Sequence, residues 1–348
     1  MNSNRTNLTA RMYARDPGTD PPAQTAFRAA EKKYQLKLVE QFRTSANGRR
    51  RGGRFVAEPV DLRDALDLSK DAANAHGATL AREEGAVKVY ALDEHPGFYY
   101  VSNALSSDEQ RTWVRAAATE LCEPPARTNF GKELGDLPPG LWDAAREDLM
   151  LIDGERWARP AREVKRGDAD ERLLARRLLS KLRWATVGPS FNWTSRIYEP
   201  DVPRRAISEE LVSLTRRIAS VAPENWEFEA QAGLVNYYQP GDTLNGHVDD
   251  AESNLDRPIV SISLGCPAIF LLGYEDRNRA PTALVLRTGD AVILGGESRK
   301  CYHGVPRVFE SNERGFELPD ALGADAWDEE FAEYISHTRI NISIRTID

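Results

Sequence analysis

Two histidines and one aspartate in the second half of the chain have the types and spacing of a metal site. His247 and Asp249 are two residues apart, and His303 lies much further along the chain. In an extended strand, residues i and i+2 point to the same side, so His247 and Asp249 can bind one ion together. Two imidazoles and one carboxylate on one face of an octahedron leave three positions open. This arrangement suits Fe(II) that binds a bidentate cosubstrate and O2 at the same time.

A second candidate site lies in a strictly alternating segment at the C-terminal end. Its polar residues are Arg339, Asn341, Ser343 and Arg345. One interpretation is a solvent-facing polar face opposite an apolar face of isoleucines. The other is a binding site for a dicarboxylate, because arginine binds a carboxylate through two parallel hydrogen bonds. Asn236 and Tyr238, two residues apart on an earlier predicted strand, can contribute further hydrogen bonds from the same side.

The residues from 231 onward predict the scaffold that must position both sites. Short β-rich runs separated by turn residues fall at 234–238, 259–264, 268–272, 283–286, 291–294, 305–309 and 340–347. Many short strands with few helices between them are typical of an antiparallel sandwich or jelly roll, and not of βαβ units. We therefore expect an α+β protein with a double-stranded β-helix (jelly-roll) core, flanking helices and an N-terminal helical extension. His303 is expected just past one of the strands.

The first two thirds of the chain predict helices joined by irregular segments. Residues 1–20 form a polar tail, residues 23–42 show helical periodicity, and the Gly/Arg-rich residues 47–54 are expected to hold no regular structure. Further helices are expected after the capping residue Ser106, over 171–182 and over 207–221.

These elements divide the chain into three predicted regions. They are an N-terminal extension over 1–94, a helical region over 95–230 and a jelly-roll core over 231–348, which contains an acidic insertion at 310–333.

Composition restricts the classes of function without choosing one. The 348 residues are 41% hydrophobic, which is enough for a core, and they contain no apolar run long enough to cross a membrane. The formal net charge of −8 does not exclude a nucleic-acid partner, because binding is local. Basic residues are concentrated at 49–54 and 156–183. The alternative interpretation of these two segments is a flexible loop and a solvated helix face.

The cysteines bear on the cellular compartment. Three of them at wide spacing, Cys122, Cys266 and Cys301, argue against a disulfide scaffold. We therefore expect a reducing compartment, the nucleus or the cytoplasm. Three arginines precede the first acidic residue, Asp16, so import into mitochondria is an alternative.

Several motifs together resemble the AlkB family of Fe(II)/2-oxoglutarate dioxygenases, and within it the branch called AlkB homologue one. The motifs are Asn-Tyr-Tyr-Gln-Pro-Gly-Asp at 236–242, the pair His247 and Asp249, His303 and the Arg-x-Asn-x-Ser-x-Arg ending. The segments 182–188 and 191–193 are similar to the nucleotide lid of that branch. With weaker matches further upstream, the resemblance covers most of residues 95–348.

The resemblance implies roles for both candidate sites. His247, Asp249 and His303 would bind Fe(II), and Arg339 would bind the distal carboxylate of 2-oxoglutarate. The residues implied to assist there are Asn236, Tyr238, Asn341 and Arg345. Of these, Asn341 and Arg345 would face the other end of the cosubstrate and the iron, where O2 also binds.

On the substrate side, Trp184 falls where the family places an aromatic residue that stacks on a flipped base. The candidate substrate-binding residues are Lys181, Arg183, Trp184, Phe191, Trp193 and Glu252. Phe191 replaces a tyrosine of the bacterial founder, so any hydroxyl contact there is lost. Repair members carry an acidic base-reading residue two positions after the metal aspartate, where this chain has Ala251 followed by Glu252. This departure favours the homologue-one branch over direct repair.

The implied activity is oxidative N-demethylation of nucleic acid, with release of formaldehyde, succinate and CO2. The expected substrates are N6-methyladenine in DNA or 1-methyladenine in tRNA, and the expected protein is a monomer with no membrane partner. Two alternatives remain open. One is a related oxygenase acting on a protein or small molecule, and the other is a nucleic-acid-binding module with a degenerate iron site.

Overall fold

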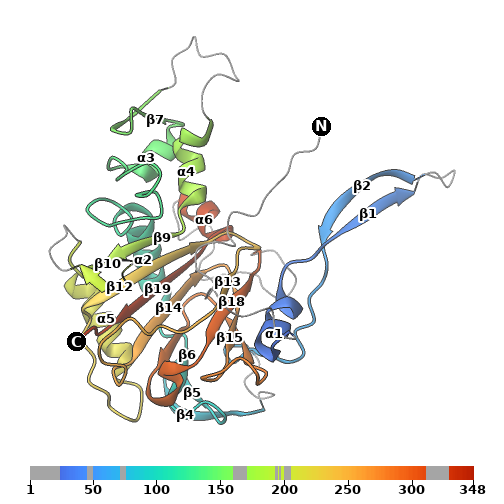
Figure 1. Cartoon of the computed structure of the whole chain (residues 1–348), viewed down its shortest axis with the longest axis vertical. Coiled ribbons are helices and arrows are strands. Elements are labelled where there is room, and N and C mark those ends of the chain that lie inside the picture. Colours follow the sequence, from blue (N-terminus) through green and yellow to red (C-terminus); the bar gives the residue numbers. More distant parts are fainter. Residues whose placement is uncertain are drawn as a thin grey trace.

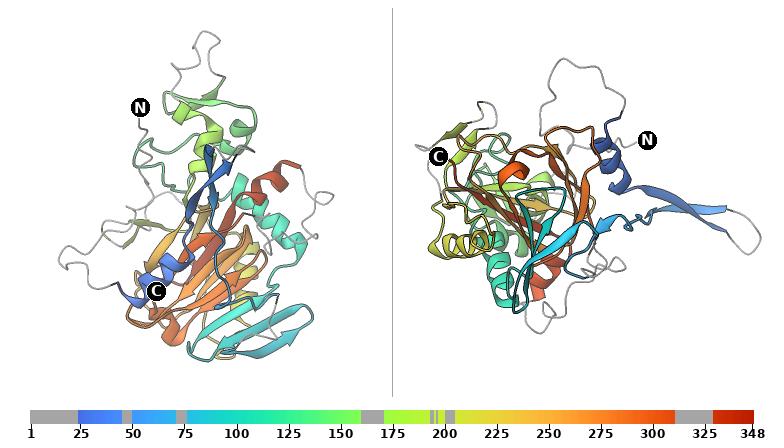
Figure 2. Two further views of the ribbon diagram at one scale, coloured as in Figure 1. Left: turned by 90° about the vertical axis from the view of Figure 1, so that its right-hand side faces the viewer. Right: turned by 90° about the horizontal axis from the view of Figure 1, so that it is seen from below.

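Two sheets face each other and form the body of the molecule (Figures 1 and 2), and every strand pair in them is antiparallel except that of β16 (Thr282–Leu286) with β3 (Ala65–Leu66). The computed structural model describes residues 24–44, 50–70, 76–159, 171–192, 195, 197–199, 205–310 and 329–348. Among the helices in these stretches, none is both long and apolar enough to cross a membrane.

The larger sheet has eight strands. Their order is β4 (Ala78–Glu84), β5 (Val87–Leu92), β6 (Phe98–Ser102), β17 (Ala291–Leu294), β14 (Ile259–Gly265), β19 (Arg339–Arg345), β12 (Ala232–Tyr238) and β9 (Trp184–Val187). The C-terminal strand β19 therefore lies inside the sheet, hydrogen-bonded to β14 on one side and to β12 on the other.

The smaller sheet has five strands. Their order is β13 (Leu244–His247), β18 (His303–Val308), β15 (Ala268–Leu272), β16 (Thr282–Leu286) and β3 (Ala65–Leu66). Side chains of both sheets fill the space between them, including Phe98 and Val292 from the larger sheet and Phe270 and Leu284 from the smaller one. Two mainly antiparallel layers around one apolar interior confirm the predicted jelly roll.

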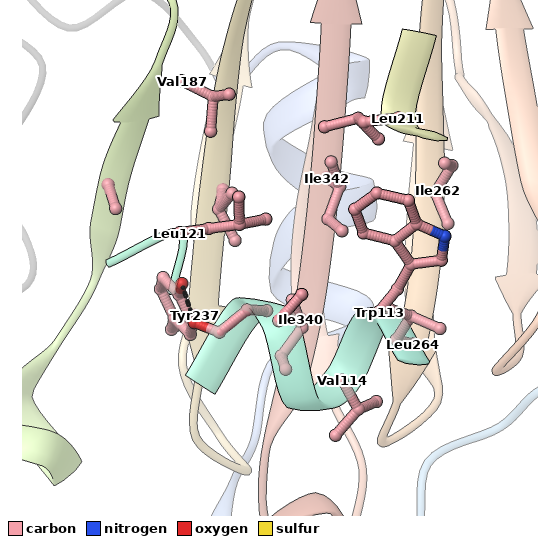
Figure 3. Packing of buried hydrophobic residues seen from close by; sticks show 14 of the residues in the cluster. Trp113, Val114, Leu121, Val187, Leu211, Tyr237, Ile262, Leu264, Ile340 and Ile342 are labelled. Carbon is pink, nitrogen blue, oxygen red and sulfur yellow. Dashed lines mark hydrogen bonds between the residues drawn. The ribbon is translucent and has the colours of Figure 1, made fainter. Parts of the chain in front are cut away.

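Helices cover the outer face of the larger sheet. They include α2 (Ser107–Thr119), α5 (Glu209–Ala219) and α6 (Glu329–Ser336). Figure 3 shows Trp113 of α2 beside Ile342 and Ile262, and the Tyr237 hydroxyl donates to the carbonyl of Ala117 at 2.7 Å. Ser106 caps α2 as predicted, since its side chain accepts from the amide of Glu109 in a capping box.

Smaller elements lie beyond the β9 end of the larger sheet and along its loops. They are α3 (Leu141–Arg146), β7 (Met150–Ile152), β8 (Arg156–Ala158), α4 (Ala175–Lys181), the hairpin of β10 (Ser190–Asn192) and β11 (Ile197–Glu199), and the 3-10 helices Glu171–Leu173 and Gly296–Lys300. The predicted helix over 171–182 is thus present as two short pieces.

The N-terminal segment differs from its prediction in two ways. The helix α1 (Ala26–Tyr34) ends early, and the chain then forms β1 (Leu38–Thr44), paired with β2 (Arg50–Ala57). The hairpin projects from the body (Figures 1 and 2), and Leu38 and Phe55 are 58% and 68% exposed. Without a surface to bury its apolar face, the helix does not continue past Tyr34. The Gly/Arg segment was predicted to be irregular, but backbone pairing places 50–54 in a strand.

Two predicted boundaries can be compared with the strands. Residue 94 falls between β5 and β6, which pair with each other in the larger sheet. In the predicted acidic insertion, residues 311–328 lie outside the described part of the chain, and α6 begins at Glu329.

The packing of β19 leads to a stability prediction. Ile342 is 0% exposed in this central strand, so Ile342→Ala should lower the free energy of unfolding by about 2–5 kcal/mol, because truncation leaves a cavity. Urea denaturation measures the change. Ile197→Ala is the control: this side chain is 57% exposed and its loss should change stability by less than about 0.5 kcal/mol. Equal small effects for both variants would contradict the packing.

Candidate metal and cosubstrate site

The three predicted metal ligands come together at one end of the jelly roll. Each offers a ligand atom, and these atoms lie within 4.8 Å of one another. His247 ends β13 and is paired directly with His303 on β18, while Asp249 lies just beyond β13. The Asp249 carboxylate oxygens are 3.7 Å from His247 Nε2 and 3.9 Å from His303 Nε2. His303 begins its strand, and does not follow one as predicted, because the ladder with β13 starts at this residue.

Both imidazoles are oriented by backbone carbonyls. His247 Nδ1 donates to the Asn245 carbonyl at 2.9 Å, and His303 Nδ1 donates to the Cys301 carbonyl at 3.2 Å. In the neutral ring this hydrogen bond places the proton on Nδ1, so that Nε2, the atom a metal needs, is the one that faces the site. Burial, together with the neighbouring His247, lowers the pKa of His303 to about 4, so this ring is neutral near pH 7.

The Asp249 carboxylate is kept ionised by its surroundings. Burial favours the neutral acid, but the positive charge of Arg345, with that of Arg299 nearby, outweighs it and holds the pKa of Asp249 well below its usual range. Two imidazoles and one carboxylate, with Nε2 and oxygen atoms facing inward, are a donor set that fits Fe(II).

Arg339 fits one carboxylate of a bound cosubstrate. It is 1% exposed between the sheets, and its Nη2 donates to Ser263 Oγ at 2.9 Å. Its Nε and Nη1 are buried and have no hydrogen-bond partner in the part of the chain that the structure describes. A buried guanidinium without an acceptor is strongly unfavourable, and a carboxylate is the acceptor that matches its two parallel N–H bonds.

The predicted assisting residues share this face of the sheet. Tyr238 lies directly opposite Arg339, and Asn236 lies directly opposite Asn341, both across the β12–β19 pair. Asn341 Nδ2 donates to Ser261 Oγ at 2.8 Å and to the Ile262 carbonyl at 2.9 Å. The alternating strand therefore presents its polar side to the interior of the roll and not to solvent.

Arg345 joins the cosubstrate strand to the metal ligands. Its Nη1 is 3.2 Å from Asp249 Oδ2 and 3.4 Å from Glu252 Oε1, and its Nη2 donates to Ser343 Oγ at 3.0 Å. Burial opposes its charge, but the two carboxylates raise the pKa of Arg345 above its ordinary value. Arg345 therefore lies beside the carboxylate of Asp249, and its role near the iron stays a prediction.

Glu252 lies behind the metal site, although a substrate contact was predicted for it. Its side chain is 0% exposed, and Oε2 accepts from Arg299 Nη2 at 2.6 Å. Oε1 accepts from the Tyr198 hydroxyl of the β10–β11 hairpin, also at 2.6 Å. Arg299 in turn donates through Nη1 to the backbone carbonyl of Asp249. The carboxylate is thus already engaged by neighbouring side chains, and it links the hairpin to the metal-binding segment.

Sequence reasoning did not identify Arg299 or Tyr198. Arg299 stands in a short polar stretch that has the composition of a surface turn, yet it is 1% exposed. Neither residue belongs to a motif or to a periodic pattern of apolar residues. The only signal in the sequence was that Arg299 lies near His303 and Tyr198 near the lid segment.

The remaining predicted substrate residues are distributed around β9. Trp184 is half-buried on β9, Phe191 packs on Tyr198 with ring centroids 5.1 Å apart, and Lys181 is exposed at the end of α4. Arg183 is paired with Asp242 at 3.4 Å. The prediction for Trp193 lies outside the described residues.

A jelly roll with two histidines and one aspartate at its mouth, and with a buried arginine between its sheets, defines iron-dependent oxygenases that use 2-oxoglutarate. Residues 149–345 match the 2OG-Fe(II) oxygenase superfamily. The chain is 35% identical to the DNA N(6)-methyladenine demethylase ALKBH1A of Arabidopsis thaliana, over 97% of this chain and all of that protein.

Two further relatives cover about three quarters of the chain. It is 31% identical to the tRNA demethylase abh1 of Schizosaccharomyces pombe, over 75% of this chain and 82% of that protein. It is also 31% identical to the human nucleic acid dioxygenase ALKBH1, over 75% of this chain and 66% of that protein. The chain therefore belongs to the AlkB family within the 2OG-Fe(II) oxygenase superfamily, as its motifs predicted. Fe(II), 2-oxoglutarate and O2 are accordingly its cofactors.

The unpaired donors of Arg339 lead to a prediction about the cosubstrate. Arg339→Ala should raise the apparent KM for 2-oxoglutarate by at least about tenfold, since a charge-assisted hydrogen bond is worth about 1.5–3 kcal/mol and 1.4 kcal/mol is one decade. Succinate formation at varied 2-oxoglutarate measures it. Ser263→Ala removes only the hydroxyl that orients Arg339 and should have a smaller effect. An unchanged KM in Arg339→Ala would mean that this arginine is purely structural.

Proposed function

We propose that this chain oxidatively demethylates N-methylated bases in nucleic acid, with N6-methyladenine in DNA and 1-methyladenine in tRNA as the leading substrates. The observation that carries the proposal is the complete set of metal-binding side chains in a chain that matches a DNA demethylase over 97% of its own residues. The names of two further relatives, a tRNA demethylase and a nucleic acid dioxygenase, support the same class of substrate.

Different residues of the chain have different roles in the proposed reaction. His247, Asp249 and His303 would hold Fe(II), and Arg339 would hold one carboxylate of 2-oxoglutarate. Bound there, iron and 2-oxoglutarate supply the activation of O2 that oxidises the methyl carbon, with succinate and CO2 as coproducts. Arg345 keeps the Asp249 carboxylate ionised, and the carbonyls of Asn245 and Cys301 accept from Nδ1 and so orient each ring with Nε2 toward the site.

The strand register of Trp184 supports a role in base stacking. Residues directly opposite each other in adjacent antiparallel strands share a face of the sheet. Trp184 is opposite Asn236, Asn236 is opposite Asn341, and Asn341 is opposite Ser263 on the next strand. This row continues the cosubstrate-binding face to the edge strand β9. A methylated base that leaves its stack to reach the iron can stack there on an indole ring.

The segment after Asp249 bears on which lesion is accepted. Ala251 has no carboxylate, and the Glu252 carboxylate is occupied by Arg299 and Tyr198. Neither residue offers a free acidic group to read a damaged base. This favours substrates that are recognised by stacking and shape over lesions that need an acidic base reader.

The proposed substrate class is tested with a panel of methylated DNA and tRNA oligonucleotides, incubated with Fe(II) and 2-oxoglutarate and analysed by mass spectrometry. Loss of the methyl group together with equimolar succinate is the expected result. Succinate formation with methylated peptides or small molecules, and none with the oligonucleotides, would instead support the alternative of an oxygenase with a different substrate.

The position of Trp184 gives a more specific prediction. Trp184→Ala should weaken binding of a methylated oligonucleotide by about one to two decades, because stacking is worth about 1–3 kcal/mol per base. Trp184→Phe retains a stacking ring and should recover part of the affinity. Replacement of Lys181 should instead reduce the salt dependence, since phosphate contacts act through counterion release. Wild-type affinity in Trp184→Ala at low salt would exclude the stacking role.

A further inference from the structure

The strand that delivers His247 has an irregular pairing just before that ligand. Leu244 pairs with Val305 and His247 pairs with His303, with a register shift between the two pairs. Asn245 and Gly246 are therefore displaced from the ladder. Backbone groups in such a bulge need other partners, because an unpaired buried N–H or C=O is strongly unfavourable.

One peptide group in this bulge is bonded at both ends. The peptide joins Asn245 to Gly246. Its N–H donates to Glu31 Oε1 of α1 at 2.7 Å, and its carbonyl accepts from His247 Nδ1 at 2.9 Å. A continuous path of hydrogen bonds thus runs from a carboxylate, through one peptide group, to the imidazole of a metal ligand.

The surroundings hold this peptide tightly. Glu31 is 4% exposed, and its other oxygen accepts from Arg28 Nη1 at 2.7 Å. A Cβ on Gly246 would lie 2.4 Å from the Phe27 ring, so α1 packs directly on the backbone. On the neighbouring strand β18, a Cβ on Gly304 would lie 3.0 Å from the Gly246 nitrogen, so this strand also packs closely on the peptide.

A second side chain completes the bulge. Arg277 Nη2 donates to the Gly246 carbonyl at 2.8 Å, and the Arg277 carbonyl accepts from the Phe27 amide at 3.0 Å. The amide and the carbonyl of Gly246 are therefore satisfied from α1 and from the loop that α1 contacts.

We propose that Glu31 is a positioning residue for the metal ligand His247 and acts on it through the 245–246 peptide. A carboxylate that accepts the peptide N–H polarises the peptide and strengthens its carbonyl as an acceptor. The carbonyl then fixes the ring orientation and tautomer of His247, as carboxylates do when they contact metal-binding histidines directly. The N-terminal helix is in this way part of the metal site, although it supplies no ligand.

The competing explanation is that Glu31 only fastens α1 to the body. The two explanations differ in what a metal probe measures, because fastening changes stability whereas positioning changes metal affinity. The inference rests on the metal site and not on the proposed nucleic-acid substrate. A probe that uses no substrate therefore keeps the two proposals separate.

The test uses the metal-free full-length protein, titrated with Co(II) and followed by visible absorption. Glu31→Ala should weaken Co(II) binding by about tenfold and alter the absorption spectrum, in line with the usual effect of losing an outer-shell partner. Glu31→Gln retains an oxygen acceptor for the Gly246 amide and should remain close to wild type. Lys32→Ala is the matched control, since Lys32 is exposed on the same helix.

Thermal unfolding of the same metal-free variants separates affinity from stability. Wild-type Co(II) affinity and spectrum in Glu31→Ala, with only a lower Tm, would overturn the proposal. If Glu31→Ala does not fold, Glu31→Asp replaces it, because its carboxylate is one methylene shorter and should bind Co(II) more weakly than Glu31→Gln. Equal affinity in the Asp and Gln variants would then contradict the positioning role.

Discussion

The ion pair between the carboxylate of Asp249 and Arg345 holds the metal-binding site together. A carboxylate with little solvent remains ionised only where positive or polar groups compensate it. Here Arg345 faces one oxygen from the central strand β19, and Arg299 holds the aspartate's backbone carbonyl. Both guanidiniums are themselves balanced by Glu252, which is buried behind them. The metal-binding segment, the cosubstrate strand and the helix before β18 are thus connected through one group of charges.

The jelly roll explains why these groups meet. Its larger sheet carries Arg339 and Arg345 on the central strand β19, and its smaller sheet carries the two histidines on the paired strands β13 and β18. A cosubstrate held by Arg339 would therefore lie between the sheets, with its other end toward the three metal-binding side chains. Two elements outside the jelly roll are hydrogen-bonded to its rim. Tyr198 connects the β10–β11 hairpin to Glu252, and Glu31 connects α1 to the bulge before His247.

The parts of this site that could be predicted from sequence are those with a local period or a motif. The alternation at 339–345 and the spacing of His247 and Asp249 each follow from strand geometry, and the strands of the jelly roll follow from their turn residues. Glu31 and Arg299 act on residues 215 and 47 positions away, and no local pattern encodes such contacts. Glu252 was assigned to the substrate because it adjoins Asp249 in sequence, but the turn after Asp249 directs it to Arg299. The helix predicted to reach residue 42 ends at Tyr34, since periodicity alone does not show where a surface to pack against ends.

Three side chains from the rim of this jelly roll, His247, Asp249 and His303, are proposed to bind iron together with 2-oxoglutarate. Anaerobic titration of the metal-free protein with Fe(II), with and without 2-oxoglutarate, tests it directly through the visible charge-transfer band of the chelate. We expect one iron per chain, a band that needs both components, and loss of the band in Asp249→Ala with the fold retained. Full iron binding and an unchanged band in Asp249→Ala would show that Asp249 is not an iron ligand.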